Sequence, residues 1–157
     1  GALPRLLDMK IELFLIASTV NLIISQRLVR RLCAMQEESA LSEAEIDALK
    51  RNVDVARVER VLKNENVLDP KISFEKMRIG RPKPSEECAD GYKGRIGIHE
   101  CLAMSPAIKE LVMRAASSDI IEKQAREEGM ITMLDEGFIR VAHKTTTIEE
   151  VLRVTSE

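Results

Sequence analysis

A pair of closely spaced glycines followed by an alternating stretch constrains the fold of this chain more than any other feature. Residues 91–100 read GYKGRIGIHE, so Gly91 and Gly94 give the backbone two places for a positive φ. From Arg95 onward, isoleucines alternate with other side chains, which is typical of a half-buried strand. These ten residues therefore predict a turn that leads directly into a strand.

The partner predicted for this strand lies far upstream in the sequence. Gln26–Cys33 alternates with a period of two, as Leu, Arg and Val residues follow one another, and this pattern predicts a strand. We predict that Gln26–Cys33 pairs with Arg95–Met104. If these two strands pair, the residues between them form an insertion at the end of a hairpin.

Helix signals precede and fill this insertion. We predict a short helix over Ala2–Met9 and a longer one over Ile11–Ser25, whose apolar residues cover more than one face. Inside the insertion, Ser42 and Glu45 have the spacing of a capping box, which predicts the start of a helix. Gly80–Glu87 is rich in proline and charge, so it predicts an exposed loop.

Helix caps mark the last third of the chain. Ser105 precedes a proline at a first helical position, and Ser118 precedes an aspartate. Thr147 stands three residues before Glu150, in the pattern of a capping box. These caps predict several short helices, and residues 105–157 together predict a small helical bundle.

The composition argues against several classes of protein. The 157 residues are 45% hydrophobic, too apolar for a disordered tail, but only 3% are aromatic, so the predicted core is aliphatic. The formal charge of −2 and the few aromatic side chains argue against a nucleic-acid partner. The most apolar run, Leu13–Ile24, is shorter than the roughly 20 residues that a membrane-spanning helix needs, so no direct membrane insertion is expected. Three widely separated cysteines do not predict a disulfide framework.

Three blocks of the sequence carry a resemblance to one protein family. CADGYKGRIGIHE, which begins at Cys88, resembles the end of the cysteine insertion in the bacterial type II secretion and type IV pilus assembly ATPases. ASTVNLIISQRLVRRLC, residues 17–33, resembles the helix and strand before that insertion. Residues 128–153 resemble the last helices of the family through EGM and TTTIEEVLRV. The blocks occur in the order found in the family, and residues 34–83 match least.

The resemblance implies a fold class and a division of the chain. The fold class would be an α/β remnant, the end of a RecA-like domain with a two-stranded hairpin, plus a mostly α-helical C-terminal bundle, and the chain would be predominantly helical overall. The trailing part of the RecA-like ATPase domain would be residues 1–33 with 91–104. An insertion with a degenerate cysteine and zinc region would span residues 34–90, and the helical bundle would span residues 105–157.

The resemblance also implies a function. Members of the family are hexameric cytoplasmic ATPases that use ATP and Mg²⁺ to power type II secretion or type IV pilus assembly, together with an inner-membrane platform protein. This chain contains no GxxxxGK[ST] loop for binding phosphates, so we expect no cofactor here and predict that the chain alone is inactive. Its expected role is subunit contact and transmission of motion, in the cytoplasm and peripheral to the inner membrane through partners.

Arg27 and Arg95 are the candidate residues for contact with nucleotide or with a neighbouring subunit. They stand in the two blocks that match best, and a guanidinium group pairs well with phosphate oxygens. The alternative, which applies equally to Arg30 and Arg31, is a solvated strand face. No catalytic residue is predicted, since no Ser/His/Asp set, carboxylate pair or Cys/His pair occurs at a suitable spacing.

Cys33 and Cys88 are the remains of a metal site that the resemblance implies. Members of the family often place a CxxC pair on each side of the insertion, which supplies four thiolates for one Zn²⁺. Here Gln36 and Ser85 stand at the other two positions, and both are poor zinc ligands. We therefore expect no bound zinc and interpret both cysteines as ordinary buried or exposed thiols.

A second hypothesis, from a different class, is a free-standing interaction module that docks on a secretion or pilus platform protein without any motor. The upstream reading frame distinguishes the two hypotheses. A phosphate-binding loop within about 150–250 residues supports the ATPase, whereas an independent start codon supports the module. An isolated piece of the ATPase would expose its apolar Leu13–Ile24 face, which predicts self-association of the chain at high concentration. The sequence does not distinguish secretion from pilus assembly or DNA uptake.

Overall fold

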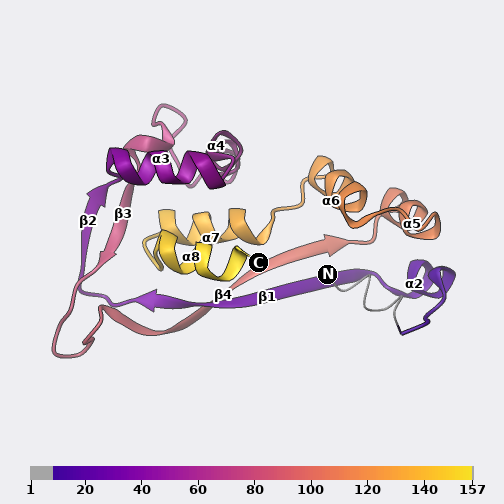
Figure 1. Cartoon of the computed structure of the whole chain (residues 1–157), viewed down its shortest axis with the longest axis horizontal. Coiled ribbons are helices and arrows are strands. Elements are labelled where there is room, and N and C mark those ends of the chain that lie inside the picture. The colour runs from indigo at the N-terminus through magenta and orange to yellow at the C-terminus, as the bar shows by residue number, and fades with distance from the viewer. Residues whose placement is uncertain (1–8, 157) are drawn as a thin grey trace. The chain divides into compact units, whose positions relative to one another are not determined.

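The computed structural model describes residues 9–156 and shows a mixed α/β fold, with more residues in helices than in strands. The elements follow one another as α2, β1, β2, α3, α4, η1, β3, β4, α5, α6, α7 and α8 (Figure 1). The helix predicted over residues 2–9 lies almost wholly outside the described residues. Among the helices that are described, none is long and apolar enough to cross a membrane.

Two long strands pair as the sequence predicts. β1 (Leu22–Leu32) and β4 (Tyr92–Ala103) form a two-stranded sheet, and the residues between them are the insertion (Figure 1). Gly91 and Gly94 have φ angles of 79° and 76°, in the left-handed region that glycine adopts at little cost. The prediction of a hairpin that carries an insertion is therefore confirmed.

The helix predicted over Ile11–Ser25 is wrong at its C-terminal end. α2 (Leu13–Thr19) stops before Val20, whose backbone is extended, and β1 takes up the last residues of the predicted helix. Two hydroxyl groups at the end of α2 donate hydrogen bonds to the carbonyl of Leu15, and such bonds compete with the helical ladder. The valine and isoleucines that follow are β-branched and favour an extended strand.

The insertion contains its own small sheet and two helices. β2 (Gln36–Ala40) pairs antiparallel with β3 (Arg78–Pro82). Between these strands the chain forms α3 (Glu43–Asn52), α4 (Val55–Asn64) and the short 3₁₀ helix η1 (Phe74–Lys76). The insertion is therefore a folded structure with its own strands, helices and hairpin.

The strands β2 and β3 are not predicted by the sequence, and β3 contradicts the first part of the loop predicted over Gly80–Glu87. β2 consists of polar and small residues with weak strand propensity, so its sequence does not mark it as a strand. Gly80 leaves room for two neighbouring side chains, because a Cβ atom there would overlap Oε1 of Gln36 in β2 and lie 2.8 Å from Cδ1 of Leu32 in β1. The loop itself begins after β3, at Lys83.

The predicted capping box at the start of α3 is confirmed. The Ser42 hydroxyl accepts a hydrogen bond from the N–H of Glu45, and the Glu45 carboxylate accepts one from the N–H of Ser42 at 2.8 Å. Arg81 in β3 donates two further hydrogen bonds of 2.5 and 2.8 Å to the same carboxylate. The hydrogen bonds from Arg81 lower the pKa of Glu45 to about 2. This carboxylate both caps α3 and ties it to β3.

Among the described residues, one compact unit combines 9–25 with 99–132. Its described helices are α2, α5 (Pro106–Met113) and α6 (Ser118–Glu127), and α2 packs on α5. Ser105 caps α5 as predicted. The N-cap residue of α6 is Ser117, whereas the sequence predicted Ser118. The buried residues of this core are Ile16, Ala17, Met104, Ile108, Val112, Ile121 and Ala125.

The second compact unit combines residues 26–98 with the described residues 133–156. It contains the insertion together with α7 (Met133–Ala142) and α8 (Ile148–Thr155). Its core holds Leu41, Leu49, Val53, Val58, Leu62, Leu68, Phe74, Met77, Ile79, Phe138, Val141, Ile148 and Val151. The rings of Phe74 and Phe138 meet edge to face with their centres 5.7 Å apart. The helices of the insertion and the last two helices of the sequence thus share one apolar core.

The sequence predicts one bundle for residues 105–157, but the four helices there belong to two different cores. α5 and α6 pack with α2, whereas α7 and α8 pack with the insertion. A partly buried ion pair reinforces the second core, since Nη2 of Arg57 in α4 lies 2.7 Å from Oδ2 of the buried Asp135 in α7. Amphipathic helices do not specify their partners by sequence alone, which explains the difference. The domain boundaries predicted for the intact protein stay a prediction.

Candidate functional site

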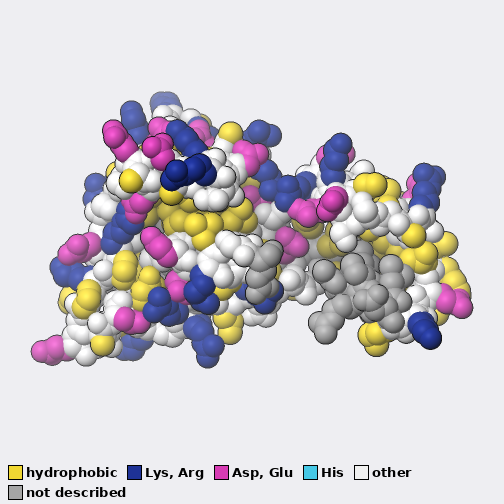
Figure 2. All heavy atoms as spheres, in the orientation of Figure 1, with side chains coloured by type: hydrophobic (Ala, Val, Ile, Leu, Met, Phe, Trp, Pro, Cys, Tyr) yellow, Lys and Arg dark blue, Asp and Glu magenta, His cyan; other side chains and the backbone are white. Residues whose placement is uncertain are grey.

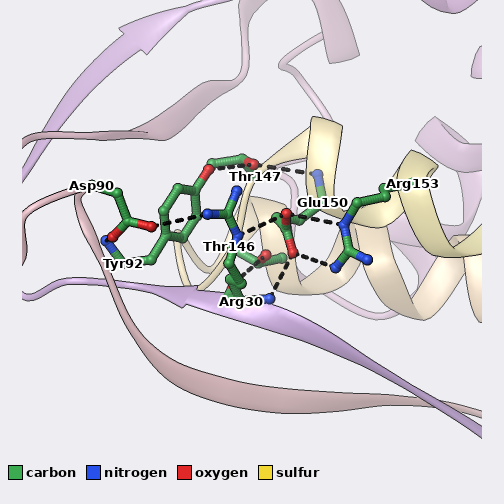
Figure 3. Close-up of polar contacts among 7 residues, drawn as sticks. All are labelled: Arg30, Asp90, Tyr92, Thr146, Thr147, Glu150 and Arg153. Carbon is green, nitrogen blue, oxygen red and sulfur yellow. Dashed lines mark hydrogen bonds and ion pairs between the residues drawn. The ribbon is translucent and has the colours of Figure 1, made fainter.

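A single carboxylate ties the last helix of the second unit to β1. Glu150 lies in the first turn of α8, and 3% of its side chain is exposed. Its Oε2 accepts the backbone N–H of Arg30 at 2.8 Å, and its Oε1 accepts Nε of Arg30 at 3.0 Å (Figure 3). Arg153, on the same helix, donates to both oxygens at 2.7 and 3.2 Å. Two arginines from distant parts of the sequence therefore converge on one buried anion.

Tyr92 supports Arg30 from the GYKGR block. The Cζ atom of Arg30 lies 4.1 Å from the centre of the Tyr92 ring, in the geometry of a cation–π contact. The Tyr92 hydroxyl lies 3.1 Å from Oγ1 of Thr147, the N-cap residue of α8. Nη1 of Arg30 also bonds to the exposed carboxylate of Asp90 at 3.0 Å (Figure 3). The start of β4 therefore contacts the same helix as β1.

Two further hydrogen bonds attach the segment before α8 to β1. The buried hydroxyl of Thr146 donates to the carbonyl of Arg30 at 2.8 Å. The N–H of Leu32 donates to the carbonyl of Thr145 at 2.9 Å. We call this cluster the Glu150 junction and define it by Arg30, Asp90, Tyr92, Thr146, Thr147, Glu150 and Arg153. It fixes the start of α8 against both strands of the hairpin.

The electrostatics of the Glu150 junction suit a structural role. Burial alone would raise the pKa of Glu150, but the hydrogen bonds from Arg153 and from the backbone and side chain of Arg30 outweigh burial and lower the pKa to about 2. The carboxylate is therefore ionised at neutral pH, and both of its oxygens are engaged. A general base needs an oxygen that can take a proton near neutral pH. Glu150 is accordingly a binding partner for arginines and not a proton-transfer group.

The sequence does not predict Glu150 or Tyr92 as site residues. Thr147 accepts the N–H of Glu150 at 3.4 Å, as a capping residue should, but the Glu150 carboxylate turns to Arg30. A capping-box glutamate usually faces its own N-cap, and 120 positions separate Arg30 from Glu150. The sequence gives only a general indication of this site. Arg30 and Glu150 both stand in blocks that match the family, but this does not show that their side chains are in contact.

Arg27 and Arg95 lie outside the Glu150 junction. Arg27 is exposed on β1 and Arg95 is exposed on β4, and their contact with nucleotide or a subunit stays a prediction. Arg30, for which a solvated strand face was the alternative, is instead held by Glu150 and Asp90. Basic and acidic side chains are interspersed over the face shown in Figure 2, so this face carries no extended patch of one sign.

Cys33 and Cys88 form a disulfide bond, which corrects the expectation of unpaired thiols. Their Cα atoms lie 6.5 Å apart although 55 positions separate them in the sequence. The hairpin explains this proximity, because Cys33 directly follows β1 and Cys88 lies shortly before β4. The N–H of Cys33 also donates to the carbonyl of Gly91 at 2.9 Å. The third cysteine, Cys101, is exposed and is not part of a disulfide.

The zinc site that the resemblance implies does not fit these residues. A thiol sulfur that is bonded to another sulfur is no longer a thiolate ligand. The described residues include no group of three or more His, Cys, Asp or Glu side chains that could hold a metal ion. Gln36, at a position where the resemblance implies cysteine, packs against Gly80 in the small sheet. No step of a mechanism is therefore assigned to zinc.

A cavity in the second unit provides little for catalysis. Its volume is about 490 Å³, and it lies at the end of α3, the start of α7 and the end of α8. Its lining contains no carboxylate, imidazole or thiol, so it offers no acid–base pair. The residues that line it are Asn52, Val53, Leu134, Leu152, Thr155 and Ser156.

Comparisons with known proteins confirm the resemblance. The family described as "Type II/IV secretion system protein" matches residues 1–153. Type II secretion system protein E of Xanthomonas campestris is 39% identical over 158 residues, which cover 100% of this chain and 25% of the relative. Type IV pilus assembly ATPase PilB of Pseudomonas aeruginosa is 35% identical over 155 residues, or 99% of this chain and 24% of the relative.

A third relative extends the same pattern. Type II secretion system ATPase E of Vibrio cholerae is 35% identical over 157 residues, which cover 100% of this chain and 27% of the relative. The chain thus spans about a quarter of the length of the curated relatives that it matches. Because the family match covers nearly all of its residues, the chain belongs to the type II/IV secretion system protein family.

Proposed function

We propose that this chain is the C-terminal part of a cytoplasmic ATPase that powers type II protein secretion or type IV pilus assembly. Its relatives carry the names of secretion and pilus ATPases, and about three quarters of their length lies outside the match. This chain has no GxxxxGK[ST] loop, so we place the binding of ATP and Mg²⁺ in the other part of such a protein.

Within such an ATPase, the proposed role of this segment is to transmit motion. The Glu150 junction is the observation that carries this proposal, because it fixes α8 to β1 and, through Tyr92, to β4. The insertion joins the same body through the shared core and the ion pair between Arg57 and Asp135. Tightly packed elements move as rigid bodies, so a displacement of the hairpin would carry the insertion and α8 with it.

The proposed assembly is a homo-oligomer, a hexamer, that works with an inner-membrane platform protein and is peripheral to that membrane. Arg27 and Arg95 are the proposed contacts with nucleotide or with a neighbouring subunit. Both side chains are exposed on the hairpin strands, and the guanidinium group is suited to phosphate and carboxylate partners.

A chimera tests the proposed function. Residues 1–157 replace the matching quarter of the Xanthomonas campestris type II secretion system protein E, in a strain that lacks the native gene. We expect the chimera to hydrolyse ATP and to restore secretion, whereas residues 1–157 alone hydrolyse none. A folded chimera that binds ATP but neither hydrolyses it nor secretes would contradict the proposal.

A second chimera tests the transmission of motion. It carries Arg30→Ala together with Glu150→Ala, which removes the main ion pair and leaves no unpaired buried carboxylate. We expect ATP hydrolysis to be retained and secretion to be lost, because both arginines of the Glu150 junction are already engaged by carboxylates of this chain. Glu149→Gln, an exposed change in the same helical turn, is the matched control and should leave both activities intact. Normal secretion by the double variant would exclude the proposed transmission.

A further inference from the structure

We propose that Cys33 and Cys88 are a reversible redox site that clamps the base of the insertion. Cys33 directly follows β1 and Cys88 lies shortly before β4, so a bond between them closes the insertion where it leaves the hairpin. Their Cα separation of 6.5 Å lies within the range in which a disulfide forms without movement of the backbone. This inference does not depend on the proposed function.

The bond is the buried anchor of the loop at residues 83–90, whose ion pairs are all exposed. These pairs join Lys83 to Glu37, Glu87 to Lys93 and Asp90 to Arg30. Between Lys83 and Asp90, Cys88 is the one buried residue, with 2% of its surface exposed. A tight turn presents its side chain, because Ser85 and Cys88 each donate their N–H to the other's carbonyl, at 2.9 and 3.1 Å. A single buried thiol contributes little apolar area once the bond is broken. The position of this loop therefore depends on the covalent link.

The rest of the insertion does not need the bond in order to stay folded. Its helices share an apolar core with α7 and α8, and the pair of Arg57 and Asp135 links α4 to α7. Reduction would therefore release the loop, while the paired strands of the hairpin and the insertion keep their fold. A bond that can break and re-form in a folded protein is suited to reversible regulation.

The redox step balances without a metal ion. On oxidation, the two thiols lose two protons and two electrons and form the S–S bond. Hydrogen peroxide takes up the two protons and the two electrons and becomes two molecules of water. On reduction, a dithiol supplies two electrons and two protons, the two thiols are restored, and the dithiol becomes a disulfide.

The segments that carry the two cysteines also contribute to the Glu150 junction, because Arg30 and Asp90 lie within three residues of Cys33 and Cys88. Oxidation would thus stiffen the base on which the junction is built.

Thiol counting tests the proposal on residues 1–157 in a Cys101→Ser background. We expect two alkylated thiols after treatment with dithiothreitol and none after treatment with hydrogen peroxide, as read by intact mass. The oxidised protein should melt roughly 5–15 °C above the reduced one, given the 55-residue separation of the pair. Cys33→Ser and Cys88→Ser should each abolish the redox-dependent shift in Tm.

Several results would overturn the redox site. Two free thiols after peroxide treatment would show that the bond does not form in solution. A bond that resists dithiothreitol in the folded protein would make it a permanent structural link. One zinc ion per chain in the dialysed, reduced protein, lost in Cys33→Ser, would show that the two thiolates serve a metal instead.

Discussion

Replacing Glu150 with glutamine is expected to lower the free energy of unfolding by about 3 kcal/mol at pH 7. The buried carboxylate accepts hydrogen bonds from Arg30 and Arg153 on both of its oxygens. The amide nitrogen of glutamine cannot accept a hydrogen bond, so the N–H groups of Arg30 and Arg153 that face this nitrogen lose their acceptor. Urea unfolding followed by circular dichroism measures the difference.

The effect of this substitution should depend on pH. A carboxyl group in the unfolded chain titrates near 4.5, whereas Glu150 in the folded protein titrates at about 2. A lowered pKa stabilises the fold fully above the unfolded value and progressively less as the pH falls toward the folded value. The difference between the wild type and Glu150→Gln should therefore shrink between about pH 4.5 and pH 2. Glu45 has a similarly low pKa but is present in both proteins, so the comparison isolates Glu150.

The matched control for this measurement is Glu149→Gln. Glu149 also lies in the first turn of α8, so it has the same relation to the helix dipole, but its side chain is exposed. We expect its substitution to change stability by less than about 0.5 kcal/mol. Equal effects of the two substitutions would show that the Glu150 junction does not stabilise the fold.

Replacing Gly137 with alanine is expected to destabilise the protein by about 2 kcal/mol, although alanine ordinarily favours a helix over glycine. A Cβ atom at Gly137 would overlap Cγ1 of Val151 and lie 3.0 Å from Cγ2. Val151 is fully buried and β-branched, so its methyl groups cannot move aside easily. The packing of α7 on α8 therefore requires a glycine at this position, and thermal and urea unfolding measure the cost.

A second substitution shows whether the clash with Val151 is the cause. Val151→Ala removes both of the methyl groups that the new Cβ would meet. In that background the new Cβ still lies 3.2 Å from the Cβ of residue 151, so Gly137→Ala should cost far less than in the wild type, about 0.5 kcal/mol or less. If Gly137→Ala is equally harmful with and without the Val151 methyl groups, the close approach of α7 and α8 is not the reason.

Local signals predicted much of the fold. The pairing of β1 with β4 was predictable because Gly91 and Gly94 mark a turn and the residues beyond alternate. The start of α3 was predictable because Ser42 and Glu45 satisfy each other within one turn. β2 was not predictable, since a strand of glutamine, glutamate and serine is held by its pairing with β3.

The grouping of the helices depends on contacts that lie far apart in the sequence. Apolar residues recur at helical spacing in α7, but nothing in the sequence shows that Phe138 meets Phe74 of the insertion. An apolar face predicts that a helix is buried but does not predict which element it packs against. The assignment of each helix to one of the two cores therefore follows only from the structure.

The same limit applies to the candidate site. Arg27 and Arg95 are candidates because they lie in matching blocks of the sequence. The role of Arg30 depends on its contact with the carboxylate of Glu150, which follows it by 120 positions and is seen only in the structure. The loss of half of each cysteine pair was visible in the sequence and argued against zinc. The bond between Cys33 and Cys88 was not visible, because it depends on how the hairpin brings the ends of the insertion together.

Hydrogen exchange under native conditions, at increasing low concentrations of urea, tests most directly whether the insertion and the last two helices act as one body. We predict that the slowest amides of α4, α7 and α8 open with one common free energy, and that Glu150→Gln lowers this free energy equally in all three helices. If the amides of α4 keep the opening free energy of the wild type while those of α8 lose theirs, the insertion and the terminal helices are independent. That result would contradict a role for this segment in transmitting motion.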